Sequence, residues 1–304
     1  MLQDWPRKTR EMHNHHMDST RWNGFAFRDG DVVIATWAKS GTTWTQQIVC
    51  QLIHGGREDL SAQDMAPWLE LRAAPWPDTL QALEAQAHRR MLKTHLPVEA
   101  LGIDPSARYI YVGRDARDVV WSMHNHHAAF RPEFLDFLNK GLPGLKGPPL
   151  APADPDVRAY YNAFLDSDDG GGFWPYWSNV QSWWDVRGLP NVILVHFAAM
   201  KADPEGQIRR IADFLGIEPD PAAWPRILEH SSFAYMKANA ERTAPMIEHV
   251  LEGGAQTFIN KGENGRWRDV LSASEIKRCD EVAAAQLTPD CAHWLATGEL
   301  PTES

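Results

Sequence analysis

The sequence predicts an α/β fold in which a central, mainly parallel β-sheet is flanked by helices. Short apolar runs alternate along the chain with longer segments of helical period. Strands that are separated by helices form right-handed βαβ crossovers, which place the strands parallel in one sheet. The 304 residues contain no internal repeat and no shift in composition, so a single domain spanning residues 1–304 is expected.

The elements follow from local patterns. Strands are predicted over residues 31–36, 90–94, 108–113 and 191–195, which are short and rich in β-branched and aromatic residues. Helices are predicted over residues 42–52, 115–127, 175–186, 204–215, 222–229 and 274–286, with Gly55-Gly56 ending the first and a proline opening the fourth. Residues 140–155 are too rich in Pro and Gly for regular structure, so a flexible, lid-like insertion is expected over about 130–172.

Composition narrows the classes of function. The net charge is −10 with His neutral, which disfavours nucleic acid as a partner. No apolar run approaches the ~18 residues of a membrane span, and Met1–Lys8 lacks the apolar core of a signal peptide. The three cysteines are too few and too scattered for a disulfide framework. A cytoplasmic protein without a membrane partner is therefore expected.

The segment Thr36–Trp44 (TWAKSGTTW) lies between a predicted strand and a predicted helix, where backbone N–H groups and the positive end of the helix dipole converge. Gly41 lets the backbone close on an anion, Lys39 adds a charge, and Ser40, Thr42 and Thr43 add hydroxyl donors. The pattern is typical of a phosphate-binding loop and makes the fold P-loop-like, although the lysine precedes the glycine, unlike GxxxxGK[ST]. The alternative is a βα turn with an incidental lysine.

Two further segments point to anion binding. Arg114 ends the third predicted strand, and Ser122 lies two turns into the next helix, so the two could bracket a second anionic group. By itself this segment is equally consistent with a solvated arginine. Residues 260–267 (NKGENGRW) form a basic loop that contains glycine, which alone would be an ordinary surface loop.

Taken together, these segments resemble the cytosolic sulfotransferase family, with a bacterial member expected. TWAKSGTTW is similar to the family's 5′-phosphosulfate loop, RDARDVVWS to its 3′-phosphate segment and KGENGRW to its late RKGxxGDW segment. KTHLP (Lys93–Pro97) is similar to the segment that carries the family's catalytic histidine. WSNVQSWW, FAAMKADP and SSFAYM also match, in order, over residues 22–272.

The resemblance implies transfer of a sulfonate from 3′-phosphoadenosine 5′-phosphosulfate (PAPS) to a hydroxyl or amine of a small, partly hydrophobic acceptor. The product would be adenosine 3′,5′-bisphosphate (PAP), and no metal would be required. The residues implied to hold the nucleotide are Lys39, Ser40, Gly41, Thr42, Thr43, Trp44, Arg114, Ser122, Phe197, Ser231, Phe233, Met236, Asn260, Lys261 and Gly262. Trp44 and Phe233 would sandwich the adenine.

The resemblance also implies the catalytic residues. His95 would take the acceptor proton as a general base during in-line displacement. Lys39 and Lys93 would stabilise the negative charge that grows on the leaving phosphate.

The chain departs from the family pattern at two nucleotide positions. Asn260 stands where the family usually has Arg, so Arg266 is the candidate replacement for a 3′-phosphate contact. Phe197 stands where the family commonly has Tyr near the adenine. The family's C-terminal dimer motif is weakly matched, which leaves monomer and homodimer open.

The chain contains 14 Trp residues, and clusters of aromatic residues are typical of apolar pockets as well as of cores. The acceptor pocket is expected to include Trp68, His127, Phe130, Phe173 and Trp177, with Phe134, Trp174 and Tyr176 as further candidates. Two His-rich segments, His13–His16 and His124–His127, could hold a metal, but lining the acceptor pocket is the preferred interpretation.

Two other functions remain open from the sequence. A P-loop kinase of small molecules would share the fold but would need carboxylates for Mg²⁺. A catalytically silent nucleotide-binding protein would not need His95 and Lys39.

Overall fold

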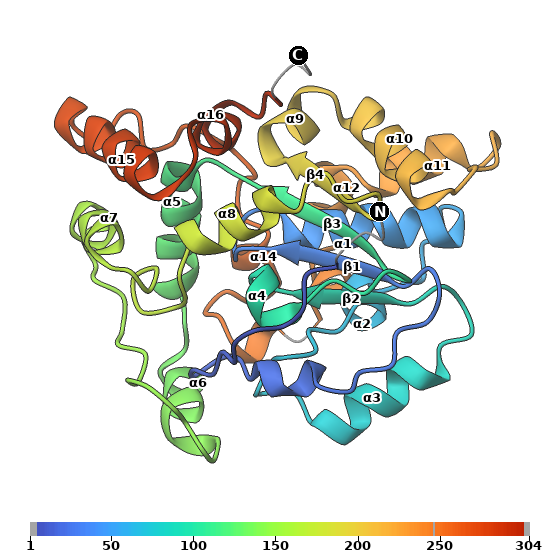
Figure 1. Cartoon of the computed structure of the whole chain (residues 1–304), viewed down its shortest axis with the longest axis horizontal. Helices are drawn as coiled ribbons and strands as arrows, with labels where there is room; N and C mark the ends of the chain where they lie inside the picture. Colours follow the sequence, from blue (N-terminus) through green and yellow to red (C-terminus); the bar gives the residue numbers. More distant parts are fainter. Residues whose placement is uncertain (1–4, 246, 301–304) are drawn as a thin grey trace.

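The central sheet contains four parallel strands in the order β2-β1-β3-β4 (Figure 1). They are β1 (Val32–Thr36), β2 (Met91–Thr94), β3 (Arg108–Gly113) and β4 (Val192–His196). The computed structural model describes residues 5–245 and 247–300. Residues 1–4, part of the segment predicted to lack a signal peptide, lie outside the described residues. No helix within the described ranges is long and apolar enough to cross a membrane.

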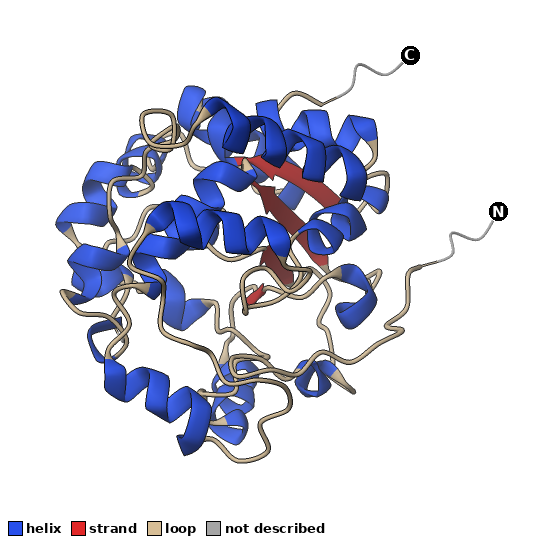
Figure 2. Cartoon of the chain, turned by 90° about the vertical axis from the view of Figure 1, so that its left-hand side faces the viewer, coloured by secondary structure: helices blue, strands red, loops and turns tan. Residues whose placement is uncertain are grey.

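Helices surround the sheet and make up most of the regular structure (Figure 2). In the first half of the chain they are η1 (Ser19–Trp22), α1 (Thr42–His54), α2 (Ala62–Met65), α3 (Trp76–Ala85), α4 (Val98–Leu101), α5 (Ala116–His127), α6 (Pro132–Asp136) and the π-helical η2 (Phe137–Gly141). In the second half they are α7 (Val157–Asp166), α8 (Trp177–Asp185), α9 (Phe197–Ala202), α10 (Pro204–Leu215), α11 (Trp224–His230), α12 (Phe233–Ala238), α13 (Ala240–Thr243), η3 (Ile247–His249), α14 (Gly254–Phe258), α15 (Ala273–Gln286) and α16 (Pro289–Thr297).

Alternate residues of the strands face two different hydrophobic cores, because successive side chains of a strand point to opposite faces of the sheet. In β1, Val33 and Ala35 join the larger core, in which the Trp residues of α8 and α16 are buried. Val32 and Ile34 join the second core, against α1, α10 and α11. Both faces of the sheet are therefore covered, as a parallel sheet requires.

The predicted strands and the six predicted helices are confirmed, each within about two residues. Several short helices were not predicted, among them α3 and α16. The expected irregular segment is confirmed only in part: residues 142–156 contain no helix or strand, whereas α6, η2 and α7 occupy the flanks of the 130–172 region.

The strand order positions the site. β1 lies between β2 and β3, with Ala35 opposite both Thr94 and Tyr111, so the carboxyl ends of the three strands lie side by side. The segments that follow them carry Lys39, His95 and Arg114 to one edge of the sheet. In open parallel sheets this edge is where ligands bind.

Candidate active site

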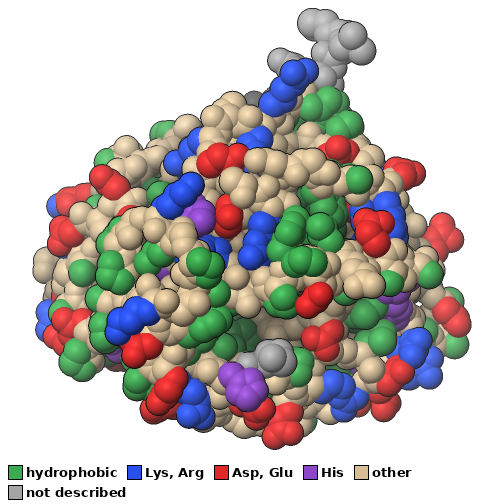
Figure 3. Space-filling model, turned by 90° about the horizontal axis from the view of Figure 1, so that it is seen from below, with side chains coloured by type: hydrophobic (Ala, Val, Ile, Leu, Met, Phe, Trp, Pro, Cys, Tyr) green, Lys and Arg blue, Asp and Glu red, His purple; other side chains and the backbone are tan. Residues whose placement is uncertain are grey.

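A cavity of about 1410 Å³ lies at the carboxyl edge of the sheet and holds most of the predicted site residues. Its surface is mainly apolar. Seen from below, hydrophobic side chains border a hollow in the molecular surface (Figure 3). The predicted site residues that line the cavity are Lys39, Gly41, Thr42, Thr43, Trp44, Trp68, Lys93, His95, Arg114, Ser122, Phe130, Phe173, Phe197, Ser231, Phe233, Met236, Asn260, Lys261 and Gly262.

The loop between β1 and α1 has the backbone conformation of an anion-binding loop. Lys39 has a φ of 65°, and it alone among the described non-glycine residues has a positive φ. Gly41 has a φ of 114°, and a Cβ there would lie 2.9 Å from the Phe197 ring, so only glycine fits. Ser40 is buried and does not line the cavity. The N–H groups of Thr42 and Thr43 begin α1 and have no acceptor within the helix.

Two lysine side chains enter the cavity without forming a salt bridge to any described residue. The Lys39 Nζ lies 4.6 Å from the centroid of the Phe258 ring, and the Lys93 Nζ lies 4.5 Å from that of Trp68. Burial, together with the nearby Arg114 and Lys93, lowers the pKa of Lys39 to about 7. Burial lowers the pKa of Lys93 to about 8. Two desolvated ammonium groups facing one space are suited to bind an anion.

Arg114 holds two separate loops against the nucleotide side of the cavity. Its guanidinium donates to the Lys39 carbonyl (2.9 Å), to the Glu263 carbonyl (3.1 Å) and to Asn264 Oδ1 (2.9 and 3.1 Å). These four bonds leave one of the five guanidinium N–H donors free. Asp118 accepts from the Gly265 N–H at 2.6 Å and so anchors the same late loop to α5.

The side of the cavity expected to hold adenine contains aromatic faces and an unused hydroxyl. The Trp44 Nε1 donates to the Ser231 carbonyl at 2.7 Å, which fixes the plane of the indole. The Ser231 Oγ is buried and has no partner among the described residues. Phe233 is 41% exposed, unusual for a phenylalanine, and its ring packs on Gly262, where a Cβ would lie 2.7 Å away. Met236 is buried beneath them.

His95 is held in one tautomer. Its Nδ1 donates to the Thr36 carbonyl at 2.8 Å, so the proton lies on Nδ1 and the Nε2 lone pair remains available. The ring packs between Trp68 (4.7 Å between centroids) and Trp174 (5.6 Å). Burial, then the charge of Lys93, lowers the pKa of His95 well below its ordinary value. The imidazole is therefore neutral near pH 7, as a general base must be.

Glu70, which the sequence analysis missed, holds the backbone of His95 in place. One carboxylate oxygen accepts from the His95 N–H (2.8 Å) and from Thr94 Oγ1 (2.9 Å), and the other accepts from Trp22 Nε1 (2.8 Å). Glu70 is completely buried, and burial raises its pKa. Glu70 also lies close enough to Lys93 to favour the charged lysine. No pattern in PWLEL distinguishes this carboxylate from a surface glutamate.

Glu70→Gln is expected to destabilise the protein and to lower turnover. The new amide would present N–H donors to a site that already contains three donors, and an unsatisfied buried donor costs about 1–3 kcal/mol. Chemical denaturation and kcat of the same preparation measure both effects. Glu281→Gln is the control, because Glu281 is 60% exposed and its partner Lys277 is 77% exposed, and such an exposed ion pair contributes little to stability. A Glu70→Gln variant with unchanged stability and kcat would contradict the positioning role.

The side of the cavity expected to hold the acceptor is aromatic, and three of the residues predicted for it do not line it. Trp68, Phe130 and Phe173 line the cavity, as do the further candidates Phe134 and Trp174. His127 does not, because its Nε2 donates to the Ala151 carbonyl (2.8 Å) and its Nδ1 accepts from the Tyr160 hydroxyl (3.2 Å).

Trp177 and Tyr176 are also buried away from the cavity. Trp177 lines a separate small hollow with Asp115 and Cys279. The Tyr176 hydroxyl donates to the Arg114 carbonyl at 2.8 Å. When aromatic residues occur on all faces of a helix, the sequence does not indicate which of them face the core and which face the cavity.

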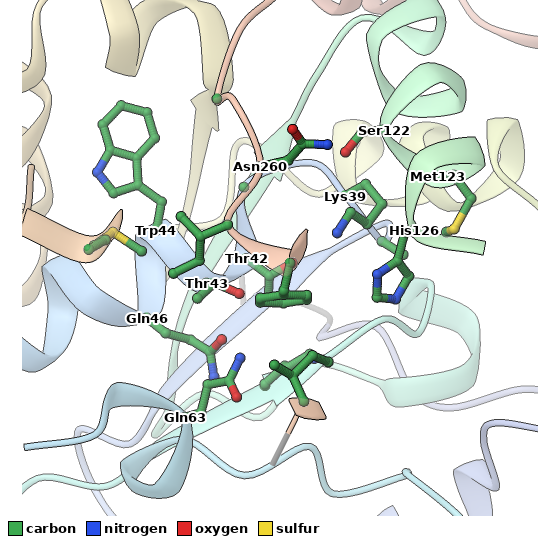
Figure 4. Close-up of a pocket in the computed structure, with 18 of the residues that line it drawn as sticks. Lys39, Thr42, Thr43, Trp44, Gln46, Gln63, Ser122, Met123, His126 and Asn260 are labelled. Atoms are coloured by element: carbon green, nitrogen blue, oxygen red, sulfur yellow. The ribbon is translucent and has the colours of Figure 1, made fainter. Parts of the chain in front are cut away.

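Several cavity residues were not predicted individually. They include His16, Gln46, Gln63, His126 and Phe258. Figure 4 shows His126 beside Lys39, with Gln46 and Gln63 near Thr43. The two histidines belong to the His-rich segments, so a signal existed for them, but the register of each segment could not be resolved. Nothing in the sequence marked the other three.

The parallel sheet and the cationic loop after β1 define an α/β protein of the P-loop-like class with an anion-binding site at the strand ends. The family model for the sulfotransferase domain matches residues 29–289 of this chain. The chain therefore belongs to the sulfotransferase family, whose members transfer a sulfonate group to an acceptor.

Individual relatives agree with this assignment. The chain is 29% identical to a glycolipid sulfotransferase of Mycobacterium bovis (strain BCG / Pasteur 1173P2), over 92% of each chain. It is 28% identical to sulfotransferase 1A1 of Rattus norvegicus, over 86% of this chain and 85% of the relative.

Solved structures share the fold. Mouse sulfotransferase SULT7A1 complexed with PAP has a TM-score of 0.67 and 24% identity, over 91% of this chain and 90% of the mouse chain. Retinol dehydratase in complex with retinol and PAP has a TM-score of 0.68 and 23% identity, over 89% of this chain and 84% of that chain.

Proposed function

We propose that this sulfotransferase uses PAPS as its donor and His95 as its base, and that its acceptor is the hydroxyl of a small, partly hydrophobic compound. The observation that carries the proposal is the convergence of Lys39, Lys93 and a neutral His95 in one cavity. Strand β2 itself supplies Lys93, and the segments that follow β1 and β2 supply Lys39 and His95. The PAP complexes of structural neighbours support the choice of nucleotide.

The residues present fit a nucleotide that is anionic at both ends of its ribose. Lys39, Lys93 and the N–H groups that open α1 would hold the 5′ end. Arg114, with its one free donor, and Ser122 would hold the 3′-phosphate. Lys261 and Arg266 lie on the same late loop and line the cavity, so Arg266 can compensate for the uncharged Asn260.

The adenine would lie between Trp44 and Phe233. The unused hydroxyl of Ser231 is placed to bond with a polar edge of the base. The 41% exposure of Phe233 is then accounted for, because the ring forms one wall of the nucleotide site. Phe197 packs against Trp44, with ring centroids 5.6 Å apart, and thereby supports the opposite wall.

The donor supplies an activated sulfonate, and the residues of the chain act on the proton and the charge. The Nε2 of His95 takes the acceptor's proton while Thr36 holds the other ring nitrogen. Lys39 and Lys93 face the position where negative charge develops, and their desolvation strengthens that interaction. Trp68 and Trp174 pack on the His95 ring and exclude water from it.

The decisive experiment offers the protein PAPS, or ATP with Mg²⁺, together with a mixture of phenols and alcohols. Mass spectrometry is expected to show acceptors that have gained one sulfonate from PAPS. PAP should also stabilise the protein by ~2.7 kcal/mol at a hundredfold excess over its Kd. Phosphate transfer from ATP would overturn the proposal in favour of a kinase. Nucleotide binding without transfer to any acceptor would favour a silent binding protein.

PAP binding is expected to take up protons and to weaken as pH rises. The pKa of Lys39 is about 7 and that of Lys93 about 8 in the free protein, and a bound phosphate moves both upward toward their ordinary range. The contribution of these two protons to affinity is therefore complete about one pH unit below the pKa of Lys39. It is lost as pH rises through 7 and 8, by up to tenfold per pH unit for each proton taken up. Calorimetry at pH 8 in buffers of different ionisation enthalpy measures the uptake. Binding that is independent of pH between 7 and 9 would contradict the lowered pKa values.

Cytoplasmic action is proposed as well. Cys50, Cys279 and Cys291 are all buried free thiols, a state that a reducing compartment preserves.

A further inference from the structure

The two His-rich segments both reach the acceptor cavity, although more than a hundred residues separate them in sequence. His16 from the first segment and His126 from the second both line the cavity. Both rings pack against Phe130. The ring centroid of His16 lies 6.2 Å from that of Phe130, and the ring centroid of His126 lies 5.0 Å from it. His15 and His127 stand behind them and pack on Phe173. The His-rich motifs therefore contribute imidazoles to the acceptor wall.

Hydrogen bonds fix the proton positions on the first pair. The His15 Nε2 lies 2.7 Å from the Gly172 carbonyl, which can only accept, so His15 carries its proton on Nε2. The Nδ1 of His15 is then an acceptor. It lies 2.5 Å from the Nδ1 of His16, which must therefore be the donor. Burial lowers the pKa of both rings, so both are neutral near pH 7.

This relay leaves the Nε2 of His16 as a lone pair without a proton. The atom bonds to no described residue, and it is not among the buried polar atoms that solvent cannot reach. Because His16 is otherwise buried and lines the cavity, its Nε2 faces the open space. The cavity thus presents a hydrogen-bond acceptor that the protein itself does not satisfy.

His95 presents a second lone pair of the same kind. Trp68 packs against both imidazoles. Its ring centroid lies 4.7 Å from that of His95 and 6.3 Å from that of His16. The imidazoles are therefore no farther apart than the sum of those distances, which a small ring compound can span. The walls between them are the aromatic faces of Trp68 and Trp174.

The charges that line the cavity favour some hydrogen-bond donors of the acceptor over others. A cationic amine would enter a space already occupied by Lys39 and Lys93, with neutral imidazoles around it. A hydroxyl carries a donor without charge. Hydroxyl groups at both ends are therefore favoured over ammonium groups.

We propose that His16 determines acceptor specificity and that the preferred acceptors are uncharged aromatic or cyclic diols. One hydroxyl lies at His95 and is sulfonated, and the second donates to His16 Nε2. This inference rests on the proposed function, because it takes the reacting hydroxyl to lie at His95. The second hydroxyl is not consumed, so the product keeps it.

The test compares dihydroxy compounds with their monomethyl ethers, using resorcinol, hydroquinone and 4,4′-biphenol as diols of increasing span. Each ether keeps one reactive hydroxyl and loses the second donor. In the PAPS assay, kcat/KM of at least one diol is expected to exceed that of its ether by about tenfold or more, because the ether leaves a buried acceptor unpaired. Binding of each pair to the PAP complex, measured by calorimetry, should also favour the diol over its ether.

Variants assign the ratio to His16. In His16→Phe the diol-to-ether ratio should fall to about two, the statistical ratio of two equivalent hydroxyls to one, whereas PAP binding is retained. His15→Phe should lower the ratio as well, because it breaks the relay that fixes the His16 tautomer. His16→Gln keeps an acceptor oxygen and should retain part of the ratio. His124→Phe is the matched control, since its Nε2 bonds to the Asp154 carbonyl and its ring does not line the cavity.

The outcomes separate the two proposals. Diol-to-ether ratios near the statistical value of about two for every pair in the unmodified protein would overturn the role of His16 and leave the sulfotransferase function intact. A ratio that persists in His16→Phe would also overturn it. If no diol or ether receives a sulfonate while PAP still binds, the proposed acceptor chemistry fails at its first step.

Discussion

The change His95→Asn is expected to lower kcat by about 10²–10⁴-fold while leaving the Kd for PAP almost unchanged. The asparagine amide can still bond to the Thr36 carbonyl and occupy the space beside Trp68 and Trp174. It cannot accept a proton at neutral pH. Steady-state kinetics with PAPS and a reactive phenol, together with calorimetry of PAP binding, separate the two effects.

The control for this substitution is His124→Asn, which changes an imidazole on α5 that does not line the cavity. It should keep kcat within a factor of about two of the unmodified protein, as surface substitutions usually do. Normal turnover in His95→Asn would remove the imidazole from the role of base. An equal loss in both variants would point to a general loss of folded protein.

The change Lys39→Met is expected to lower kcat by about 10²–10³-fold, the cost of losing one preorganised charge-stabilising donor. It should also stabilise the protein in the absence of nucleotide. Near pH 7 the buried ammonium of Lys39 is held beside Arg114 and Lys93, a repulsion that methionine removes. Thermal unfolding of the free protein should therefore begin at a higher temperature, and the gain from added PAP should shrink.

Lys140→Met is the matched control, because Lys140 is 76% exposed and pairs with Asp136 on the surface. Neither its kcat nor its response to PAP should change. A Lys39→Met variant that is less stable than the unmodified protein without nucleotide would show that the lysine supports the fold. Unchanged turnover would exclude Lys39 from charge stabilisation during transfer.

The sheet and the loop that follows β1 could be predicted because their signals are local. β1, the left-handed turn at Lys39 and Gly41, and the start of α1 all follow one another without interruption along the chain. Parallel pairing then brings the other strand ends beside this loop without further information. The helices α3 and α16 were not predicted. Tertiary packing stabilises α16, as Trp294 shows by packing on Gly113.

The acceptor side could not be predicted with the same accuracy. Its walls come from loops and from the turns of α5 and α6, and adjacent residues face opposite ways. His126 lines the cavity whereas His127 bonds to Ala151 and Tyr160, and a shift of one residue exchanges them. Glu70 was missed for another reason, since its importance comes entirely from the three donors that the fold places around it.

The order of strands in the sheet has a consequence for how such enzymes diversify. The groups proposed to handle the reacting bond sit at the ends of β1 and β2, whose spacing is fixed by ladder hydrogen bonds. The walls that meet the acceptor come from the N-terminal segment around His16, from α5 and α6, and from the loop before α8. Mutations in those walls can exchange one acceptor for another without displacing the transfer machinery, so selectivity and rate can evolve on separate parts of the chain.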